Sequence, residues 1–162
     1  MPTGPPTTSA GHRPRLVIAD DDPVVQSMLR MSLGHQFEVV GVAGDGEEAI
    51  ELARVNQPDA ALVDVKMPKG GGLRAVRGII EVAPATAIVM LSGVRSHGSV
   101  RELTQAGAIA FRRKGAAPHV LAAALIESMK VHHAERRASA WPILAWYCQG
   151  LNRRPREQIP PG

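Results

Sequence analysis

The chain has 162 residues, of which 44% are hydrophobic and 21% are charged, and its formal net charge is +4. This composition is typical of a globular protein, and no apolar run reaches the roughly 20 residues of a membrane span. The single cysteine, Cys148, excludes an internal disulfide and fits a reducing cytosol. We therefore expect a cytoplasmic protein with one domain and terminal tails.

The excess positive charge lies at the C-terminal end of the sequence. Residues 1–129 carry 13 basic and 13 acidic side chains, whereas residues 130–162 carry 6 and 2. A basic tail allows an anionic partner, although solvation is the simpler explanation for six charges. The high isoelectric point therefore says little about the body of the protein.

The first elements are a disordered leader, a strand and a helix. Residues 1–13 are rich in proline, threonine and glycine and are expected to be disordered. Residues 15–19 form a short apolar run that predicts a strand, and Asp20, Asp21 and Asp22 follow it. Asp22 with Pro23 is a typical helix start, with aspartate as the N-cap, so we expect Asp22 to cap a helix that is closed by Gly34.

The central part of the chain is predicted to hold two more strands. A strand over residues 37–43 precedes a helix that stops before Pro58, and Asp45 and Glu48 have the spacing of a capping box at its start. Residues 60–63 are four apolar residues that run directly into Asp64. Such a run is typical of a strand buried on both faces of a parallel sheet. A glycine-rich loop and a third helix, ending near Pro84, should follow.

The last elements are expected to be two strands and two helices. A strand over residues 87–91 ends at Ser92, and Ser99 and Glu102 have capping-box spacing for a fourth helix. Residues 108–113 predict a fifth strand, which Lys114 follows, and a long helix is expected from about residue 118 to about residue 140. This alternation of strands and helices predicts an α/β fold, a parallel sheet covered by helices on both faces.

Polar side chains follow four of the predicted strands. Ligands bind outside the carboxyl ends of the strands in open α/β sheets, and there Asp20, Asp21 and Asp64 would repel one another unless a cation neutralised them. Mg²⁺ prefers such oxygen ligands, and the backbone carbonyl of Lys66 could add one. Ser92 and Lys114 suit phosphoryl oxygens. Asp64 could then act as a nucleophile that forms an aspartyl phosphate.

These positions resemble a known family. The pair Asp20–Asp21, Asp64 with Met67–Pro68, Ser92–Gly93, Phe111 and Lys114 are similar in order and spacing to the receiver domain of bacterial two-component response regulators, over about residues 14–135. The resemblance implies a flavodoxin-like three-layer (βα)5 fold with a five-stranded parallel sheet in the order 2-1-3-4-5.

The resemblance also implies roles for these residues. Asp64 would accept a phosphoryl group from the histidine of a sensor kinase or a phosphotransfer protein, and Asp20 and Asp21 would bind Mg²⁺. Ser92 would hydrogen-bond the acquired phosphoryl group and Lys114 would pair with it. Ser92 and Phe111 would act as the switch, changing the surface formed by the fourth helix, fifth strand and fifth helix.

Three other functions would fit parts of this sequence. A DNA-binding regulator would need an output domain, and the roughly 30 residues after the receiver-like region show no helix-turn-helix. A transcriptional regulator that contacts DNA through the basic tail, or through a DNA-binding partner, is therefore the weaker alternative. A phosphatase with an aspartate nucleophile would carry a second aspartate two residues later, where this chain has Lys66. A pseudo-receiver that never takes phosphate is disfavoured by the intact set of acids.

The C-terminal extension, residues 136–162, is expected to hold a short aromatic helix over residues 141–151 and a basic disordered end. Ile143, Trp146, Tyr147 and Leu151 would share one helical face. That face would either fold back on the domain or bind an output partner or a second copy of the chain, since aromatic residues are enriched at interfaces. No membrane contact is expected.

Overall fold

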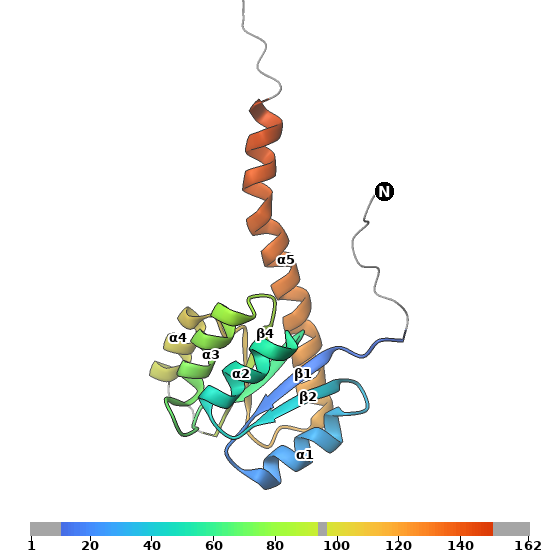
Figure 1. Cartoon of the computed structure of the whole chain (residues 1–162), viewed down its shortest axis with the longest axis vertical. Coiled ribbons are helices and arrows are strands. Elements are labelled where there is room, and N and C mark those ends of the chain that lie inside the picture. The colour runs from blue at the N-terminus through green and yellow to red at the C-terminus, as the bar shows by residue number, and fades with distance from the viewer. Residues whose placement is uncertain (1–10, 94–96, 151–162) are drawn as a thin grey trace, which may run out of the picture.

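The computed structural model describes residues 11–93 and 97–150, and within these ranges the side chains of all residues except 97–99 and 140–150. Five strands and five helices alternate along this part of the chain (Figure 1). The elements are β1 (Arg15–Ala19), α1 (Pro23–Leu33), β2 (Glu38–Ala43), α2 (Gly46–Asn56), β3 (Ala60–Asp64), α3 (Gly71–Val82), β4 (Ala87–Ser92), α4 (His97–Ala106), β5 (Ala110–Arg113) and α5 (Pro118–Gly150).

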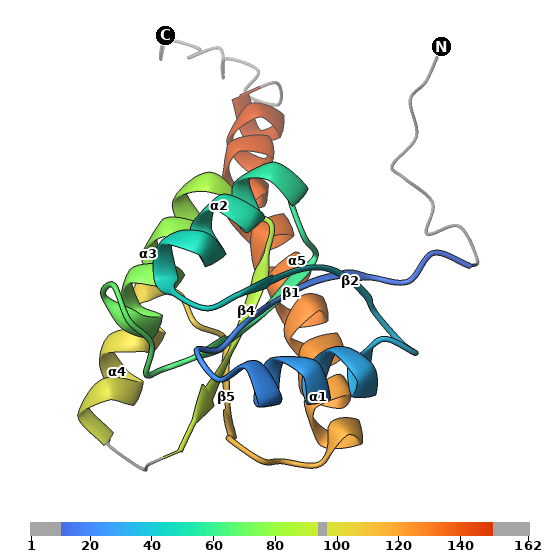
Figure 2. The same ribbon diagram turned by 60° about the horizontal axis from the view of Figure 1, so that its bottom comes forward.

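The five strands form one parallel sheet in the order β2-β1-β3-β4-β5. This order and the three-layer arrangement confirm the predicted flavodoxin-like fold. Helices α1 and α5 cover one face of the sheet, and α2, α3 and α4 cover the other (Figure 2). Because all strands run the same way, their carboxyl ends meet at one edge of the sheet, below the domain in Figure 1.

The central strand explains why the core has two halves. All five residues of β3 are buried. Ala61 and Val63 pack in the cluster beneath α2 and α3, whereas Ala60 and Leu62 pack in the cluster beneath α5. Successive side chains of a strand point to opposite faces of the sheet, so a strand between two helical layers must be apolar at every position.

Two predicted helix starts are observed. Asp22 is the N-cap of α1, where its Oδ1 accepts a hydrogen bond from the Val24 N–H at 2.8 Å. At α2, Oδ1 of Asp45 accepts from the Glu48 N–H at 2.9 Å, and Oε2 of Glu48 accepts from the Gly44 N–H at 2.8 Å. The Glu48 contact reaches one residue before the cap, so the capping box is present in a slightly extended form.

Two other boundaries differ from those predicted. Helix α4 begins at His97, so Ser99 lies inside its first turn and is not the N-cap. Helix α5 continues to Gly150, ten residues beyond the predicted end near residue 140. The predicted separate aromatic helix over residues 141–151 is therefore part of α5 as far as residue 150, and Leu151, most of the leader and the basic end lie outside the described residues.

None of the helices in the described ranges is long and apolar enough to cross a membrane.

Candidate functional site

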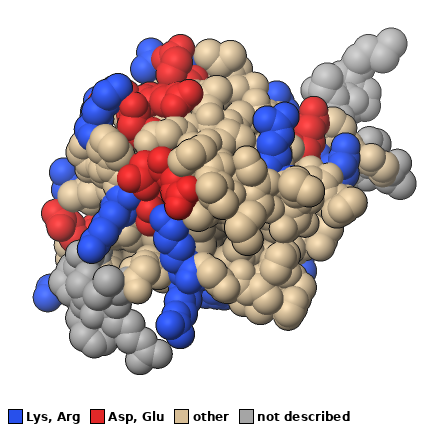
Figure 3. Space-filling model, turned by 90° about the horizontal axis from the view of Figure 1, so that it is seen from below, with Lys and Arg blue, Asp and Glu red and all other residues tan. Residues whose placement is uncertain are grey.

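Three carboxylates lie together at the carboxyl ends of β1 and β3. Oxygen atoms of Asp20, Asp21 and Asp64 all lie within 4.8 Å of one another. Asp20 is fully buried and Asp64 is 3% exposed, whereas Asp21 is exposed. Figure 3 views the molecule from this side and shows a group of acidic side chains with lysine and arginine side chains beside it. The structure thus brings together the three acids that the sequence predicts for the site.

Lys114 joins two of these acids from the other side of the site. Its Nζ lies 2.8 Å from Oδ2 of Asp64 and 2.9 Å from Oδ2 of Asp20. It also donates a hydrogen bond to Oδ1 of Asp20 at 3.1 Å. Burial lowers the pKa of Lys114, but hydrogen bonds and charge from Asp64 and Asp20 outweigh that effect and raise the pKa above its ordinary value of 10.5. The ammonium group is therefore charged at neutral pH.

One oxygen of Asp20 is incompletely satisfied. Oδ2 forms an ion pair with Lys114 by distance, yet it is the one buried side-chain polar atom of the described residues that accepts no hydrogen bond. A buried carboxylate oxygen without a hydrogen-bond partner is costly. Because hard divalent cations prefer such oxygens, the acids of this structure fit a Mg²⁺ ion, which Asp20, Asp21 and Asp64 would hold.

The loop after β1 is held in place by a residue that the sequence analysis did not single out. Gln26, in α1, donates from Nε2 to the carbonyl of Asp20 at 2.6 Å and to the carbonyl of Ala43 at 3.2 Å. The Asp22 N–H donates to Oδ1 of Asp20 at 2.9 Å. These contacts orient Asp20 toward the site. The spacing of Gln26 from the aspartates, one helical turn inside α1, is the only sequence signal for this role.

The turn after Asp64 depends on a close approach between β3 and α3. A Cβ atom at Gly72 would lie 2.7 Å from the carbonyl oxygen of Asp64 and 2.8 Å from the side chain of Met90. Only glycine lets the start of α3 lie against the end of β3 in this way. Lys66, with an exposed side chain, lies in the same turn, and its N–H lies 3.4 Å from Oδ1 of Asp64.

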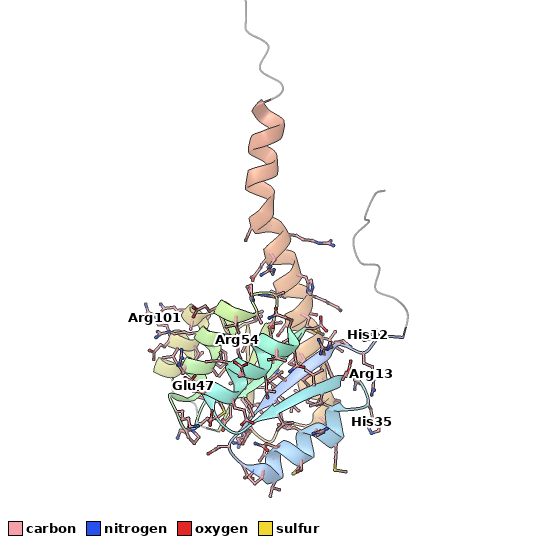
Figure 4. The ribbon with its side chains drawn as sticks, viewed as in Figure 1. His12, Arg13, His35, Glu47, Arg54 and Arg101 are labelled. Carbon is pink, nitrogen blue, oxygen red and sulfur yellow. The ribbon has the colours of Figure 1, made fainter. Side chains whose placement is uncertain are left out.

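Two ion pairs connect this turn to α2. Nζ of Lys69 lies 2.8 Å from Oδ2 of Asp45, and Nε of Arg74 lies 2.8 Å from Oε1 of Glu47. Figure 4 labels Glu47 at the end of α2 that faces the α3 side of the domain. The hydrogen bond from Lys69 lowers the pKa of Asp45, and the same bond raises the pKa of Lys69. The Arg74–Glu47 pair is exposed and Lys69 is exposed in the other pair, so each pair contributes little to stability.

Ser92 and Phe111 lie on the neighbouring strands β4 and β5. Ser92 ends β4, and its carbonyl accepts a hydrogen bond from the Lys114 N–H at 2.9 Å. Phe111 is half-buried and packs against the core cluster beneath α2 and α3. Gly115, which follows Lys114, has a φ of +87°. A proline could not adopt that angle, whereas glycine adopts it without strain.

The fold and the acidic site define a class of signalling protein, the receiver domain of two-component systems. A family model described as the response regulator receiver domain matches residues 16–126, and the chain belongs to this family. Receiver domains are signalling domains, and most have no enzymatic activity of their own.

Among curated relatives, the transcriptional regulatory protein PdtaR of Mycobacterium tuberculosis is 39% identical over 116 residues, which cover 67% of this chain and 54% of PdtaR. The uncharacterized transcriptional regulatory protein YxjL of Bacillus subtilis is 33% identical over 133 residues, covering 81% of this chain and 61% of YxjL. The chain thus spans a little more than half the length of these relatives.

Solved structures give the same family. The signal receiver domain of the putative response regulator NarL from Mycobacterium tuberculosis has a TM-score of 0.70 and 27% sequence identity, covering 74% of this chain and 98% of that domain. The response regulator domain of CheB from Thermotoga maritima is also 27% identical, with a TM-score of 0.63, and the alignment covers 75% of this chain and 96% of that domain.

Proposed function

We propose that Asp64 accepts a phosphoryl group and that the phosphorylated domain signals by binding another protein. The donor would be a phosphohistidine of a sensor histidine kinase or a phosphotransfer protein. The N–P bond of the donor breaks, a bond forms between an Asp64 oxygen and phosphorus, and the leaving imidazole nitrogen takes up a proton. The observation that carries this proposal is the position of Asp64, nearly buried at a strand end and 2.8 Å from the ammonium group of Lys114.

The other residues of the site would divide the work of stabilising charge. Asp20, Asp21, Asp64 and the backbone carbonyl of Lys66 would hold Mg²⁺, which offsets negative charge on the transferring phosphoryl group. Lys114 would turn from the Asp64 carboxylate to the new phosphoryl oxygens, which carry more charge. In this proposal Ser92 donates its hydroxyl hydrogen to the same group. These assignments follow the chemistry of the side chains and their positions at adjoining strand ends.

The signal would leave the site through Ser92 and Phe111. Lys114 and Ser92 are linked by the hydrogen bond between their backbones, and Phe111 lies three residues before Lys114 on β5. A shift of Ser92 toward the phosphoryl group would change the packing around Phe111, which is only half-buried. The altered surface would be the α4–β5–α5 face, where an output partner or a second copy of the chain would bind in the cytoplasm.

The first test is intact-mass spectrometry after incubation with Mg²⁺ and acetyl phosphate. We expect the mass of one phosphoryl group on the wild-type protein and none on Asp64→Ala or in a metal-free sample. Asp59→Ala is the matched control, because Asp59 is an aspartate outside the site and contacts the Arg15 N–H instead. If acetyl phosphate gives no adduct, titration with beryllofluoride, which mimics a bound phosphoryl group, decides the question. Amide NMR spectra that stay unchanged throughout the beryllofluoride titration would refute the proposal.

An enzymatic function is the less favoured alternative. A phosphatase of this layout needs a proton donor two residues after the nucleophile, and here that residue is Lys66. Lys66 is therefore not the carboxylic acid that such an enzyme would use to protonate the leaving alcohol. We therefore propose that the only catalysis is the phosphorylation and dephosphorylation of the domain itself. Steady turnover of a phosphate monoester such as p-nitrophenyl phosphate would overturn this conclusion.

Regulation of transcription is the second candidate function. The names of PdtaR and YxjL describe those two relatives as transcriptional regulatory proteins. In this chain the basic tail, including Arg153, Arg154 and Arg156, is the segment that could contact DNA, and it lies outside the described residues. Such contact would be independent of DNA sequence and would weaken steeply with salt. Fluorescence anisotropy with duplex DNA over a salt series, with and without beryllofluoride, distinguishes this function from protein binding.

A further inference from the structure

Helix α5 extends well beyond the domain that it packs against. It has 33 residues, and at about 1.5 Å per residue it is about 50 Å long. Only its first half lies against the sheet, and the second half projects away from the domain with no other described element beside it (Figure 1).

One face of α5 belongs to the domain. Leu121, Leu125 and Ser128 are buried beneath it. Further along, Nε2 of His132 and Nη1 of Arg136 both donate to the carbonyl of Pro84, at 2.9 and 2.6 Å. These two contacts lie one helical turn apart and attach the helix to the loop between α3 and β4. The direction in which α5 leaves the domain is therefore set by this pair.

The opposite side of the helix carries small apolar residues in solvent. Val131 is 36% exposed, and Ala134 and Ala138 are also exposed. At 100° per residue these three lie within about 60° of one another and centre about 150° from His132 and Arg136. Their spacing of three and four residues is that of the a and d positions of a heptad. Because α5 continues to Gly150, the same register falls on Trp141, Ala145 and Cys148.

A projecting helix of this kind needs a partner. Isolated helices of about 12–15 residues are marginal in water, and most helix stability comes from packing of an apolar face. The heptad register from Val131 to Cys148 would supply such a face, and its described members, Val131, Ala134 and Ala138, are all exposed. The charged residues beside this row indicate which partner covers it.

We propose that the occupant is a second copy of this chain, whose α5 pairs with the first as a parallel two-stranded coiled coil from Val131 onward. With Val131 at a, Lys130 falls at g and Glu135 at the following e position. In a parallel pair each g residue faces the next e residue of the partner helix. Lys130 would thus face Glu135 of the second copy, and the two-fold axis would form this ion pair twice.

An antiparallel pair matches the charges less well. It would bring g positions together and e positions together, and the g positions carry Lys130 and Arg137. Among parallel coiled coils, a β-branched residue at an a position, such as Val131, favours two strands over three or four. Glu127, one position before Val131 in the row, is exposed and charged, so the pairing should begin at Val131, where α5 leaves the domain. Pro142 falls at an e position, beside the contact and not within it.

The first experiment measures the mass of the full-length protein by sedimentation equilibrium over a range of concentrations. We expect a dimer. Ala138→Glu should raise the dissociation constant about tenfold or more, since it places two like charges in the contact. Ser139→Glu adds the same charge one residue away at an outward position and should leave the dimer unchanged. Circular dichroism of all variants verifies that the domain is folded.

A charge exchange tests the parallel arrangement. Lys130→Glu should weaken the dimer because Glu would face Glu135 of the second copy. Combining Lys130→Glu with Glu135→Lys restores opposite charges and should recover most of the lost affinity. Glu135→Lys alone should also weaken the dimer. Two changes that each weaken the dimer can restore it together only if the two residues face each other, so recovery cannot arise from a general effect on helix stability.

The single cysteine supplies an independent test. In a parallel pair the two Cys148 residues occupy facing d positions, so oxidation by dioxygen with copper phenanthroline should link them rapidly into a disulfide dimer. In a Cys148→Ser background, Ser139→Cys carries the thiol at an outward position. Its rate of disulfide formation should be at most about one tenth of the rate at Cys148. Equal rates in a dimeric protein would overturn the parallel register.

The proposal does not depend on phosphorylation, because no residue of the contact belongs to the acidic site. Asp64→Ala should therefore dimerise like the wild type even if Asp64 accepts no phosphate. A wild-type protein that stays monomeric at all concentrations would overturn the proposal, and so would an Ala138→Glu variant that dimerises as tightly as wild type. In either case the occupant of the exposed row on α5 would be a different protein.

Discussion

The ammonium group of Lys114 lies 2.8 Å from Oδ2 of Asp64, although the two residues are 50 positions apart in sequence. The contact forms because β5 and β3 end at the same edge of the sheet, with β4 between them. In the same position Lys114 is 2.9 Å from Oδ2 of Asp20. One cation thus neutralises part of the charge that Mg²⁺ would otherwise neutralise, and the two should compete.

This competition predicts the effect of removing the lysine charge. Lys114→Met should raise the affinity for Mg²⁺ about fivefold or more, because a unit charge about 4 Å from another is worth about 1 kcal/mol even in water. The same variant should be phosphorylated more slowly by acetyl phosphate. Isothermal titration calorimetry measures the first effect and intact-mass kinetics the second.

Lys114→Arg is the control for charge. It keeps the cation but replaces a compact ammonium group by a larger planar one, so its Mg²⁺ affinity should stay near that of the wild type. Weaker Mg²⁺ binding in Lys114→Met than in wild type would contradict the competition between the two cations.

The neighbouring acids Asp21 and Asp22 should separate into two roles. Asp22→Ala removes the N-cap of α1 and should lower the free energy of unfolding by about 1 kcal/mol, with little effect on Mg²⁺ affinity. Asp21→Ala should weaken Mg²⁺ binding and change stability by less than about 0.5 kcal/mol, since its side chain is exposed. Urea unfolding and Mg²⁺ titration of both variants check this. A large loss of Mg²⁺ affinity in Asp22→Ala would assign that residue to the metal.

Gly72 should tolerate no side chain. Gly72→Ala places a Cβ 2.7 Å from the carbonyl oxygen of Asp64, so the turn beside the site must move, and we expect a loss of about 1–3 kcal/mol in unfolding free energy. Phosphorylation of Asp64 should also slow. Gly93→Ala is the matched control, because a Cβ at Gly93 would meet nothing within 4 Å. Equal stabilities of the two variants would show that α3 can shift without cost.

The pKa of Lys114 sets the pH range over which its ion pairs stabilise the folded protein. Because folding raises the pKa of Lys114 above 10.5, the stability that its ion pairs contribute is fully present below pH 10.5 and is lost as pH rises through the higher pKa of the folded state. The difference in unfolding free energy between wild type and Lys114→Met should therefore be constant from pH 7 to about pH 10 and shrink above it. Urea denaturation across that range measures it. A difference that already shrinks near pH 8 would mean that the pKa of Lys114 is lowered.

Much of the fold was predictable because the strands are strongly patterned. Apolar runs ending in Asp20, Asp64 and Ser92 located β1, β3 and β4, and their shared polar ends indicated one site. The strand order came from the resemblance to receiver domains. The contacts of Gln26 and of Lys69 could not be predicted, because they depend on how α1 and the turn after β3 lie against neighbouring elements, and a single side chain in such a contact leaves no periodic signal.

The two misplaced helix boundaries have physical explanations. Ser99 and Glu102 have good cap spacing, but a cap contributes only about 1 kcal/mol, and α4 gains a further half turn by starting at His97. Pro142 made an interruption of the last helix plausible, since proline removes a backbone hydrogen bond. Helix α5 nevertheless continues through Pro142 to Gly150, because a single lost hydrogen bond does not force the chain to leave the helix.

The course of α5 also places the acidic site and the far end of the helix well apart. The helix starts four residues after Lys114, beside the acids, and its far end lies about 50 Å away beyond the opposite edge of the sheet (Figure 1). A kinase approaching Asp64 and a second copy of the chain paired along the far part of α5, as proposed above, would therefore not compete for the same surface. The proposed dimer could be phosphorylated on both copies without coming apart.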